Sequence, residues 1–197
     1  LREIGLEYRL YPINIGKGDQ FDPEFLSVSP NNRIPAIVDH EPEGGGDSIS
    51  VFESGAILLY LAEKCGQFLP ADKRLRVQTI EWLMWQMGGV GPMFGQVHHF
   101  VKYNKGKSAY AEERYSKEAR RLYGVMDKRL GQHQYISGKE YSIADISIWP
   151  WTARFDWQEI DLNEYPNVTR WYKEISSRPA VQKGWLVPEN DQVIPQP

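Results

Sequence analysis

Glu53 and Ser54 lie side by side at the point where a short β-branched run gives way to a helical pattern. Backbone N–H groups without acceptors gather at the start of a helix, together with the positive end of its dipole, so Ser54 can add a hydroxyl donor to an anion site there. The Glu53 carboxylate can accept hydrogen bonds from an ammonium group. The pair therefore suits an amino-acid head group, which carries both charges. Taken alone, it is equally consistent with a serine cap beside a solvated glutamate.

Ile34-Pro35 is a second pair that could contact a ligand, in this case through the backbone. The residue before a proline is held extended, and proline itself donates no backbone hydrogen bond. If the bond between the two residues is cis, the turn presents the N–H and C=O of Ile34 outward, where an extended peptide can pair with them. The alternative is an ordinary start of a strand with a trans proline.

The remaining reactive side chains do not assemble into a site. Cys65 lies near the end of a predicted helix, where the dipole disfavours a thiolate, so we interpret it as a buried or idle thiol rather than a nucleophile. His98 and His99 are adjacent, and on a helix their side chains point about 100° apart, so they cannot grip one metal ion together. We expect no metal site.

The elements that must position the two pairs lie in a first half of mixed α and β patterns, residues 1–66. We expect a helix tail at Leu1–Gly5, a strand in the alternating segment LEYRLYPIN, a short helix opened by Asp22-Pro23-Glu24, strands at Ile34–Val38 and Ile49–Phe52, and a helix from Ser54 to about Lys64 capped by Gly66. The Ile34–Val38 strand should be covered on both faces. The order α-β-α-β-β-α indicates a small mixed sheet with helices, from which one leading strand is missing.

The second half is helical in pattern. Residues 67–75 form a predicted linker broken by Pro70, residues 76–186 an all-helical domain, and residues 187–197 a proline-rich tail that is extended or disordered. We expect helices from Arg76, at Ala109–Leu130, from Ser142 and from Pro166, with Gly88–Met93 kinking or interrupting the first.

The spacing of Ser142 and Asp145 is that of a capping box, in which each side chain accepts from the backbone N–H of the other residue. We therefore interpret Asp145 as a folding element and not as a catalytic acid.

Composition narrows the functional classes. Hydrophobic residues make up 41% of the chain, charged residues 25%, and the net charge is −3. Mild acidity without a run of Lys and Arg argues against nucleic acid as the main partner, and no apolar stretch is long enough to span a bilayer. A single cysteine cannot form an internal disulfide, which is typical of a reducing compartment, so we expect a cytoplasmic protein.

A series of segments carries a resemblance to a known family. The segments NNRIPAIVD and SVFESGAILLYLAEK resemble those of the glutathione transferases, and the match continues through WLMWQMGGVGPMFGQVHHF, AEERYSKEARRLYGVMDKRL, YSIADISIWPW and SRPAV. It covers nearly the whole chain from Leu6 to about Ala180 and is closest to the bacterial nu class and the related yeast prion-type proteins. The resemblance implies a thioredoxin-like N-terminal domain that lacks its first strand, a helical-bundle C-terminal domain, glutathione as co-substrate and a homodimer.

The resemblance also implies roles for individual residues. Ile34 of the Pro35 loop would pair with the cysteine residue of glutathione, and Arg33 would lie along its backbone. Glu53 and Ser54 would hold its γ-glutamyl end. Gln20, in the loop before the first complete helix, would also contact glutathione. Arg114 would offer its charge to a glutathione carboxylate, either within the same subunit or from the partner subunit of a dimer. A surface salt bridge is the alternative for Arg114.

The typical activity of the bacterial group is glutathione-dependent disulfide reduction, and this is the function we expect, with a small disulfide or hydrophobic co-substrate. Conjugation of glutathione to electrophiles and a non-catalytic regulatory or binding role remain alternatives. The thiol-activating residues of the family lie at the end of its first strand and in the loop that follows. We expect them to precede Leu1, so no residue of this sequence is assigned a catalytic role.

Overall fold

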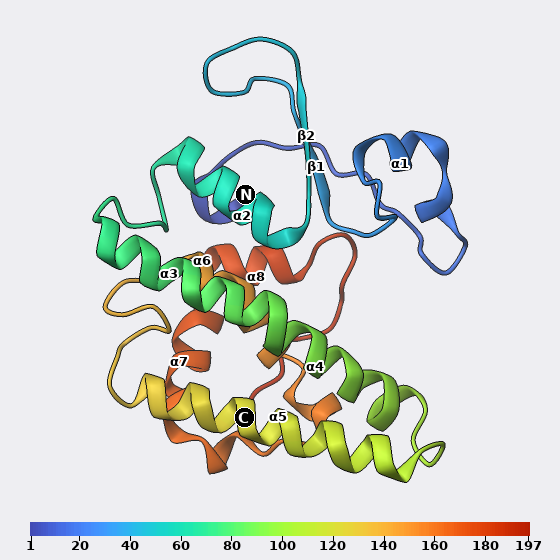
Figure 1. Ribbon diagram of the computed structural model, residues 1–197, viewed down its shortest axis with the longest axis vertical. Coiled ribbons are helices and arrows are strands. Elements are labelled where there is room, and N and C mark those ends of the chain that lie inside the picture. The colour runs from blue at the N-terminus through green and yellow to red at the C-terminus, as the bar shows by residue number, and fades with distance from the viewer. The chain divides into compact units, whose positions relative to one another are not determined.

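A computed structural model describes residues 1–197, which fall into two units, Leu1–Leu69 and Pro70–Pro197 (Figure 1). The boundary between the units lies within the segment 67–75 that has a linker-like sequence.

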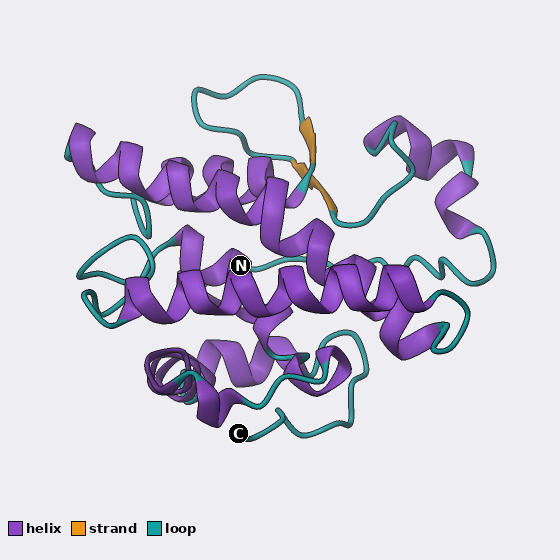
Figure 2. Ribbon diagram, turned by 60° about the horizontal axis from the view of Figure 1, so that its bottom comes forward, coloured by secondary structure: helices purple, strands orange, loops and turns teal.

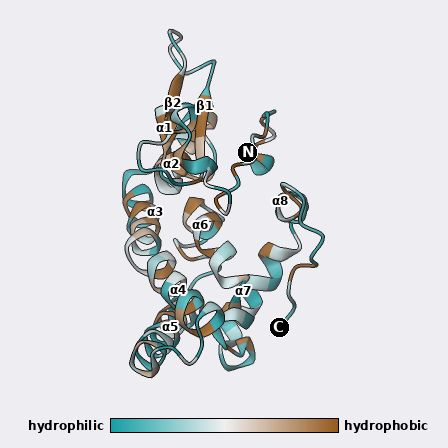
Figure 3. Ribbon diagram, turned by 90° about the vertical axis from the view of Figure 1, so that its right-hand side faces the viewer, coloured by the Kyte–Doolittle hydropathy of each residue, from teal (hydrophilic) through white to brown (hydrophobic).

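A β-hairpin is the centre of the first unit. Strand β1 (Ala36–Asp39) pairs antiparallel with β2 (Ile49–Phe52), and the register sets Ala36 opposite Phe52 (Figure 2). The bounds of β2 are as predicted, and β1 begins two residues later than predicted. The strands carry hydrophobic residues (Figure 3), but Val38 is 42% exposed, so the prediction of cover on both faces was wrong. An antiparallel hairpin can leave one face open to solvent, unlike the strands of a parallel sheet.

The predicted strand in LEYRLYPIN is absent, and this segment is extended without ladder pairing. Alternation of apolar and polar residues favours an extended chain, but a strand also needs a neighbouring backbone to complete its hydrogen bonds. In the described chain, β1 and β2 pair only with each other. Before this segment, a short 3₁₀ turn, η1 (Arg2–Ile4), ends at Gly5 with φ of 67°, in agreement with the expected helix tail.

Local capping explains the helices of the first unit. The short 3₁₀ turn η2 (Asp19–Phe21) precedes α1 (Pro23–Val28). Asp22 caps the start of α1, because its carboxylate accepts from the Glu24 N–H at 2.8 Å. Helix α2 (Ser54–Cys65) ends at Gly66, which adopts the left-handed conformation with φ of 63°. Both helices were predicted from these signals.

The second unit is helical throughout. Its elements are α3 (Lys73–Trp85), η3 (Gln86–Val90), α4 (Gly91–Val97), η4 (His98–Tyr103), α5 (Ala109–Leu130), α6 (Ile143–Thr152), η5 (Phe155–Gln158), η6 (Leu162–Glu164), α7 (Pro166–Ser176) and α8 (Pro179–Trp185). Helix α5 has the predicted bounds, and α6 and α7 begin where they were expected. Helix α3 begins at Lys73 rather than at Arg76 as predicted, and α8 was not predicted.

The glycine-rich segment Gly88–Met93 changes the winding of the helix that begins with α3 and does not end it. Element η3 is a π-helical turn, after which α4 resumes the regular winding with Pro92 in its first turn, where proline is tolerated. A Cβ at Gly91 would lie 2.7 Å from Nε2 of Gln86, so a larger residue there would force the Gln86 side chain to move. The predicted interruption is thus confirmed as a local widening of the helix.

Large aromatic side chains fill the core of this unit. Trp171, Tyr123, Tyr172 and Phe94 are fully buried, and the rings of Phe94 and Tyr123 stack with centroids 5.0 Å apart. Burial of a side chain of this size contributes about 1.5–3 kcal/mol. No helix is long and apolar enough for a membrane span.

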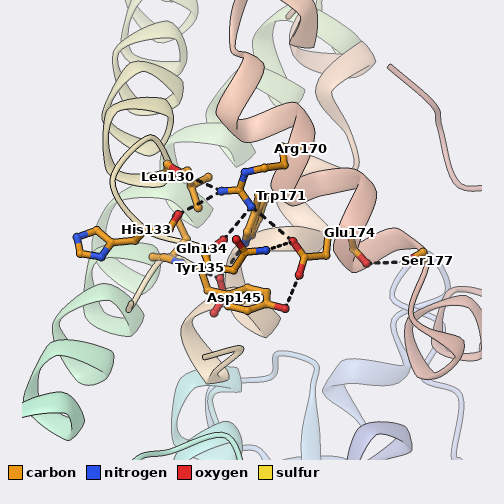
Figure 4. A network of polar contacts seen from close by, with 10 residues as sticks. Leu130, His133, Gln134, Tyr135, Asp145, Arg170, Trp171, Glu174 and Ser177 are labelled. Atoms are coloured by element: carbon orange, nitrogen blue, oxygen red, sulfur yellow. Dashed lines mark hydrogen bonds and ion pairs between the residues drawn. The ribbon is translucent and has the colours of Figure 1, made fainter. Parts of the chain in front are cut away.

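Asp145 is the buried polar centre of the unit (Figure 4). Its carboxylate accepts from the Ile136 N–H at 2.9 Å, from both the N–H and the hydroxyl of Ser142 at 3.0 Å, and from the Trp171 indole at 2.8 Å. Burial raises the pKa of this carboxyl, and the donors oppose that rise by stabilising the charged form. The predicted capping box is present, and it also ties α6 to α7 and to the segment after α5.

The proline-rich tail packs against the same unit. The Tyr172 hydroxyl donates to the Pro195 carbonyl at 2.8 Å, the Trp185 indole donates to the Gln192 carbonyl at 2.6 Å, and Ile194 is 9% exposed. The sequence left an extended arm and a disordered segment open for the tail, and proline content alone cannot detect a contact such as that between Tyr172 and Pro195, 23 residues apart.

Asp145→Asn should lower the free energy of unfolding by about 2–4 kcal/mol. The NH₂ group of asparagine would replace one carboxylate oxygen, and the buried donors that bond to that oxygen would lose their acceptor. Urea denaturation measures the change. Asp161→Asn is the matched control, since Asp161 caps the exposed turn η6 through the Asn163 N–H at 2.9 Å and asparagine caps equally well. Equal losses in the two variants would contradict the role of Asp145.

His98 makes stability depend on pH. It is 9% exposed, and burial, with a smaller contribution from Arg154, lowers its pKa from 6.5 to about 4. Between these values the unfolded chain binds a proton that the folded chain does not, so the free energy of unfolding should fall as the pH falls. Urea denaturation across this range should show a shallower decline for His98→Gln than for the parent. A similar change for exposed His99→Gln would contradict the assignment to His98.

Candidate functional site

The loop before β1 presents the first pair of candidate residues. The Ile34–Pro35 peptide bond is cis, and Ile34 is 51% exposed. Pairing of β1 with β2 begins at Ala36, so the backbone of Ile34 takes no part in that ladder. Arg33, which precedes it, is exposed. The loop thus has the conformation on which the prediction of an outward-facing Ile34 backbone depended.

Ser29 holds this loop in place through a buried hydroxyl group. It is fully buried, and its hydroxyl donates to the Arg33 carbonyl at 2.7 Å. Its backbone N–H completes the end of α1 by donating to the Phe25 carbonyl at 2.9 Å, and its carbonyl accepts from the Asn32 N–H at 2.9 Å. Sequence analysis missed Ser29, because a serine within a loop gives no signal that its hydroxyl is buried.

Glu53 and Ser54 form the junction between β2 and α2. Glu53 precedes the helix and has φ of 68°, a conformation that residues other than glycine rarely adopt, and its side chain is exposed. Ser54 is the first residue of the helix and is half-buried. The cap position therefore belongs to Glu53, not to serine. The Glu53 side chain makes no capping hydrogen bond, and the N–H groups of the first helical turn have no acceptors within the helix.

The hairpin register brings the two pairs together. Because Ala36 lies opposite Phe52, Pro35 and Glu53 follow at the same end of the paired strands. Residues nearly twenty positions apart in the sequence thus form one surface of cis-proline loop, carboxylate and helix N-terminus. This surface has the backbone of Ile34, which the hairpin leaves unpaired, at one side and the Glu53 carboxylate with the start of α2 at the other.

Gln20 lies on η2, which packs against α1, and α1 packs against both strands of the hairpin. Its amide oxygen is buried and has no hydrogen-bond partner in the chain. A buried acceptor without a partner destabilises the free protein by about 1–3 kcal/mol, so a ligand N–H that reached it would remove that cost.

Arg114 belongs to the other unit of the chain, where it lies on α5. Its side chain is exposed. The glutamate one turn further along the helix, Glu118, is bonded to Arg121 at 2.7 Å. The alternative of a salt bridge between Arg114 and a helical neighbour is therefore not realised at Glu118.

A polar cluster that sequence analysis missed anchors the opposite end of the hairpin. Asp39 accepts from Lys64 and, at 2.6 Å, from the Tyr60 hydroxyl, and Lys64 also donates to the Glu41 carbonyl at 2.6 Å. These donors lower the pKa of the Asp39 carboxyl to about 2, and the carboxylate raises the pKa of Tyr60 to about 12. The sequence held one signal for this cluster: Tyr60 and Lys64 are four residues apart on α2, so their side chains share one face of the helix.

Models of a known protein family match both units of this chain. Residues 1–63 match the model for the glutathione S-transferase N-terminal domain, and residues 89–179 match that for the C-terminal domain. The disulfide-bond oxidoreductase YfcG of Escherichia coli (strain K12) is 54% identical over 186 residues, covering 94% of this chain and 86% of that protein.

Two solved structures extend the comparison. A glutathione transferase family member from Pseudomonas fluorescens Pf-5, with two glutathione bound, has a TM-score of 0.88 and 46% identity over 93% of this chain and 83% of that one. A glutathione transferase from Pseudomonas putida, with one glutathione disulfide bound per subunit, has a TM-score of 0.89 and 44% identity over 95% of this chain and 84% of that one.

This chain belongs to the glutathione transferase family. Its first unit is the thioredoxin-like domain of that family with a reduced sheet, and its second is the helical domain, as the resemblance implied. The closeness to YfcG confirms the expected similarity to bacterial disulfide-bond oxidoreductases.

Ser29→Ala should loosen the cis-proline loop, because the Arg33 carbonyl would lose its buried donor. We expect faster amide hydrogen exchange across residues 30–34 and a loss of about 1–2 kcal/mol in the free energy of unfolding. Ser27→Ala is the control, since its hydroxyl donates to the Glu24 carbonyl at 2.6 Å within exposed α1. Unchanged exchange in Ser29→Ala would contradict the role of this hydroxyl.

Proposed function

We propose that this protein binds glutathione on the surface formed by the cis-proline loop and the Glu53–Ser54 junction, and uses it to reduce disulfides. The observation that carries the proposal is the hairpin register, which places Pro35 and Glu53 at one end of the paired strands. Glutathione is a peptide with an amino-acid head group, and this surface offers a partner for each of those features.

Each part of the ligand has a proposed partner. The backbone of Ile34 pairs with the cysteine residue of glutathione, and Arg33 lies along the peptide. Ser54 and the first N–H groups of α2 hold the γ-glutamyl carboxylate, while Glu53 accepts from the ammonium group. The buried amide oxygen of Gln20 accepts from a ligand N–H, which supplies the partner that it lacks in the free chain.

The proposed reaction is thiol–disulfide exchange. A glutathione thiolate attacks one sulfur of the substrate disulfide, a mixed disulfide forms, and the other substrate sulfur leaves as a thiolate that takes up a proton. A second glutathione thiolate attacks the mixed disulfide, so glutathione disulfide and the second substrate thiol are released. Two features of relatives support this choice: the name of YfcG and the glutathione disulfide bound to the Pseudomonas putida protein.

The proposal also includes the oligomeric state and the cellular compartment of the protein. We assign Arg114 to a glutathione carboxylate of the partner subunit in a homodimer, because its exposed guanidinium can pair with an anion that another copy of the chain presents. The single cysteine supports work in the reducing cytoplasm, where glutathione is available as a thiol.

Calorimetry with glutathione, followed by an assay of 2-hydroxyethyl disulfide reduction, tests binding and turnover separately. We expect binding and glutathione-dependent release of 2-mercaptoethanol. Absence of binding would refute the proposed site. Binding without turnover would refute disulfide reduction as the activity and favour a regulatory role, whereas turnover of an electrophile alone would favour conjugation.

Glu53→Gln and Ser54→Ala should each weaken glutathione binding by about 1–3 kcal/mol, roughly 5- to 150-fold in Kd, because each removes a hydrogen bond to a charged ligand group. Calorimetry again gives the measurement. Glu24→Gln is the matched control, since Glu24 is an exposed carboxylate of the same unit. An equal effect at Glu24 would show a general charge effect instead of a head-group site.

A further inference from the structure

The polar cluster of Asp39, Tyr60 and Lys64, which we call the clasp, joins β1 to α2 at the end of the hairpin opposite the proposed glutathione surface. At the other end, β2 passes into α2 at Glu53. Since β1 and β2 are paired along their whole length, the hairpin and the helix are attached to each other at two points, the clasp and the junction at Glu53.

These two attachments are well separated along both elements. The strand from Ile49, the partner of Asp39, to Glu53 spans about 13 Å at about 3.3 Å per residue. The helix from Ser54 to Lys64 spans about 15 Å at about 1.5 Å per residue. A bond between the far ends of two elements of similar length sets the angle between them. Burial of apolar side chains of α2 is not directional, so it tolerates a small rotation of the helix.

The clasp is a directional contact that water screens little. The side chains of Asp39 and Lys64 are 14% and 22% exposed, and Oδ2 of Asp39 accepts from Lys64 and, at 2.6 Å, from the Tyr60 hydroxyl. Partly buried charge pairs are screened less than exposed ones. Because Lys64 and Tyr60 hold the pKa of the Asp39 carboxyl at about 2, the clasp keeps its charge at any pH near neutrality.

Glu53 has a strained backbone at the other attachment. Its φ is 68° and its ψ is 118°, and its carbonyl accepts the first hydrogen bond of the helix from the Ile57 N–H at 2.9 Å. A residue other than glycine keeps such a conformation only where the surrounding structure imposes it. If α2 were free to turn about the junction, Glu53 would relax to negative φ and its carboxylate would move away from the start of α2.

We propose that the clasp positions the Glu53 carboxylate for the ammonium group of glutathione, by holding α2 at the angle that keeps Glu53 at positive φ. Asp39 is thus a positioning residue, which acts through Glu53 and does not touch the ligand. The inference rests on the proposed function, because it concerns the residue assigned there to the ammonium group.

Calorimetry with glutathione on the full chain tests the proposal. Asp39→Asn should weaken binding about fivefold or more, because apparent affinity falls with the fraction of chains in the competent conformation. The direction of the change separates positioning from charge. Glutathione carries two carboxylates and one ammonium group, so the loss of a negative charge from the protein would by itself favour binding.

Glu43→Gln is the matched control for charge. Glu43 is an exposed carboxylate in the hairpin loop, near enough to act on Tyr60 electrostatically, but it takes no part in the clasp. We expect its affinity for glutathione to stay within about twofold of the parent. No loss of affinity in Asp39→Asn, or an equal loss in Glu43→Gln, would overturn the proposal.

Double-mutant cycles distinguish positioning from a general loosening of the unit, because residues that act through one another give non-additive effects. In a Glu53→Gln background, Asp39→Asn should change the affinity by less than about twofold. In a Ser29→Ala background, which loosens only the cis-proline loop, it should keep its full effect. An equal effect in the two backgrounds would contradict action through Glu53 and overturn the proposal.

A milder variant decides the matter if Asp39→Asn does not fold. Tyr60→Phe removes one donor and keeps both the ring and the ion pair of Asp39 with Lys64. Binding about twofold weaker, and coupled to Glu53→Gln in the same cycle, supports the clasp, and unchanged affinity overturns it.

The outcome at Glu53 separates this inference from the proposed function. If Glu53→Gln alone leaves glutathione affinity unchanged, the head-group site fails and the role of the clasp fails with it. If Glu53→Gln weakens binding and the clasp variants do not, the head-group site stands and only the positioning role is overturned.

Discussion

The antiparallel pairing of β1 with β2 is the constraint on which the proposed glutathione surface depends. With Ala36 opposite Phe52, the cis-proline loop and the start of α2 emerge at one end of the hairpin. A slip of one residue would reverse the face of every side chain in the moving strand and displace the carboxylate from the loop. At the other end, Asp39 fastens β1 to α2 through Tyr60 and Lys64, so the strand and the helix share one anchor.

The helical unit is organised around a different constraint, the segment between α5 and α6. This segment has little regular structure, and its backbone is satisfied by side chains from three helices: Arg129 of α5, Asp145 of α6 and Arg170 of α7. Buried or partly buried charged groups here replace the backbone partners that a helix would provide. The same arrangement fixes the guanidinium of Arg129 over the ring of Trp82, 5.2 Å from its centroid.

Local signals account for most of what the sequence predicted correctly. The helix α5, the cap of α6 at Ser142 and the end of α2 at Gly66 each depend on residues within a few positions of one another. Features that depend on partners distant in sequence were missed. The alternating segment after Gly5 was predicted as a strand but has no strand beside it, and the contact of the tail with Tyr172 was not predicted.

The candidate site divides in the same way. The residue types of Ile34-Pro35 and Glu53-Ser54 indicated head-group and backbone recognition, but their placement at one end of a hairpin required the register. The buried oxygen of Gln20 and the support from Ser29 could not be inferred, because the burial of a polar atom depends on how the whole unit packs.

The backbone of Glu53 has an evolutionary consequence. A non-glycine residue with φ of 68° carries a conformational cost of order 1 kcal/mol or more, which glycine would remove. That replacement would also delete the carboxylate. Selection for a more stable chain and selection for head-group binding therefore favour different residues at position 53. A substitution that stabilises the chain there would remove the carboxylate on which the proposed binding depends.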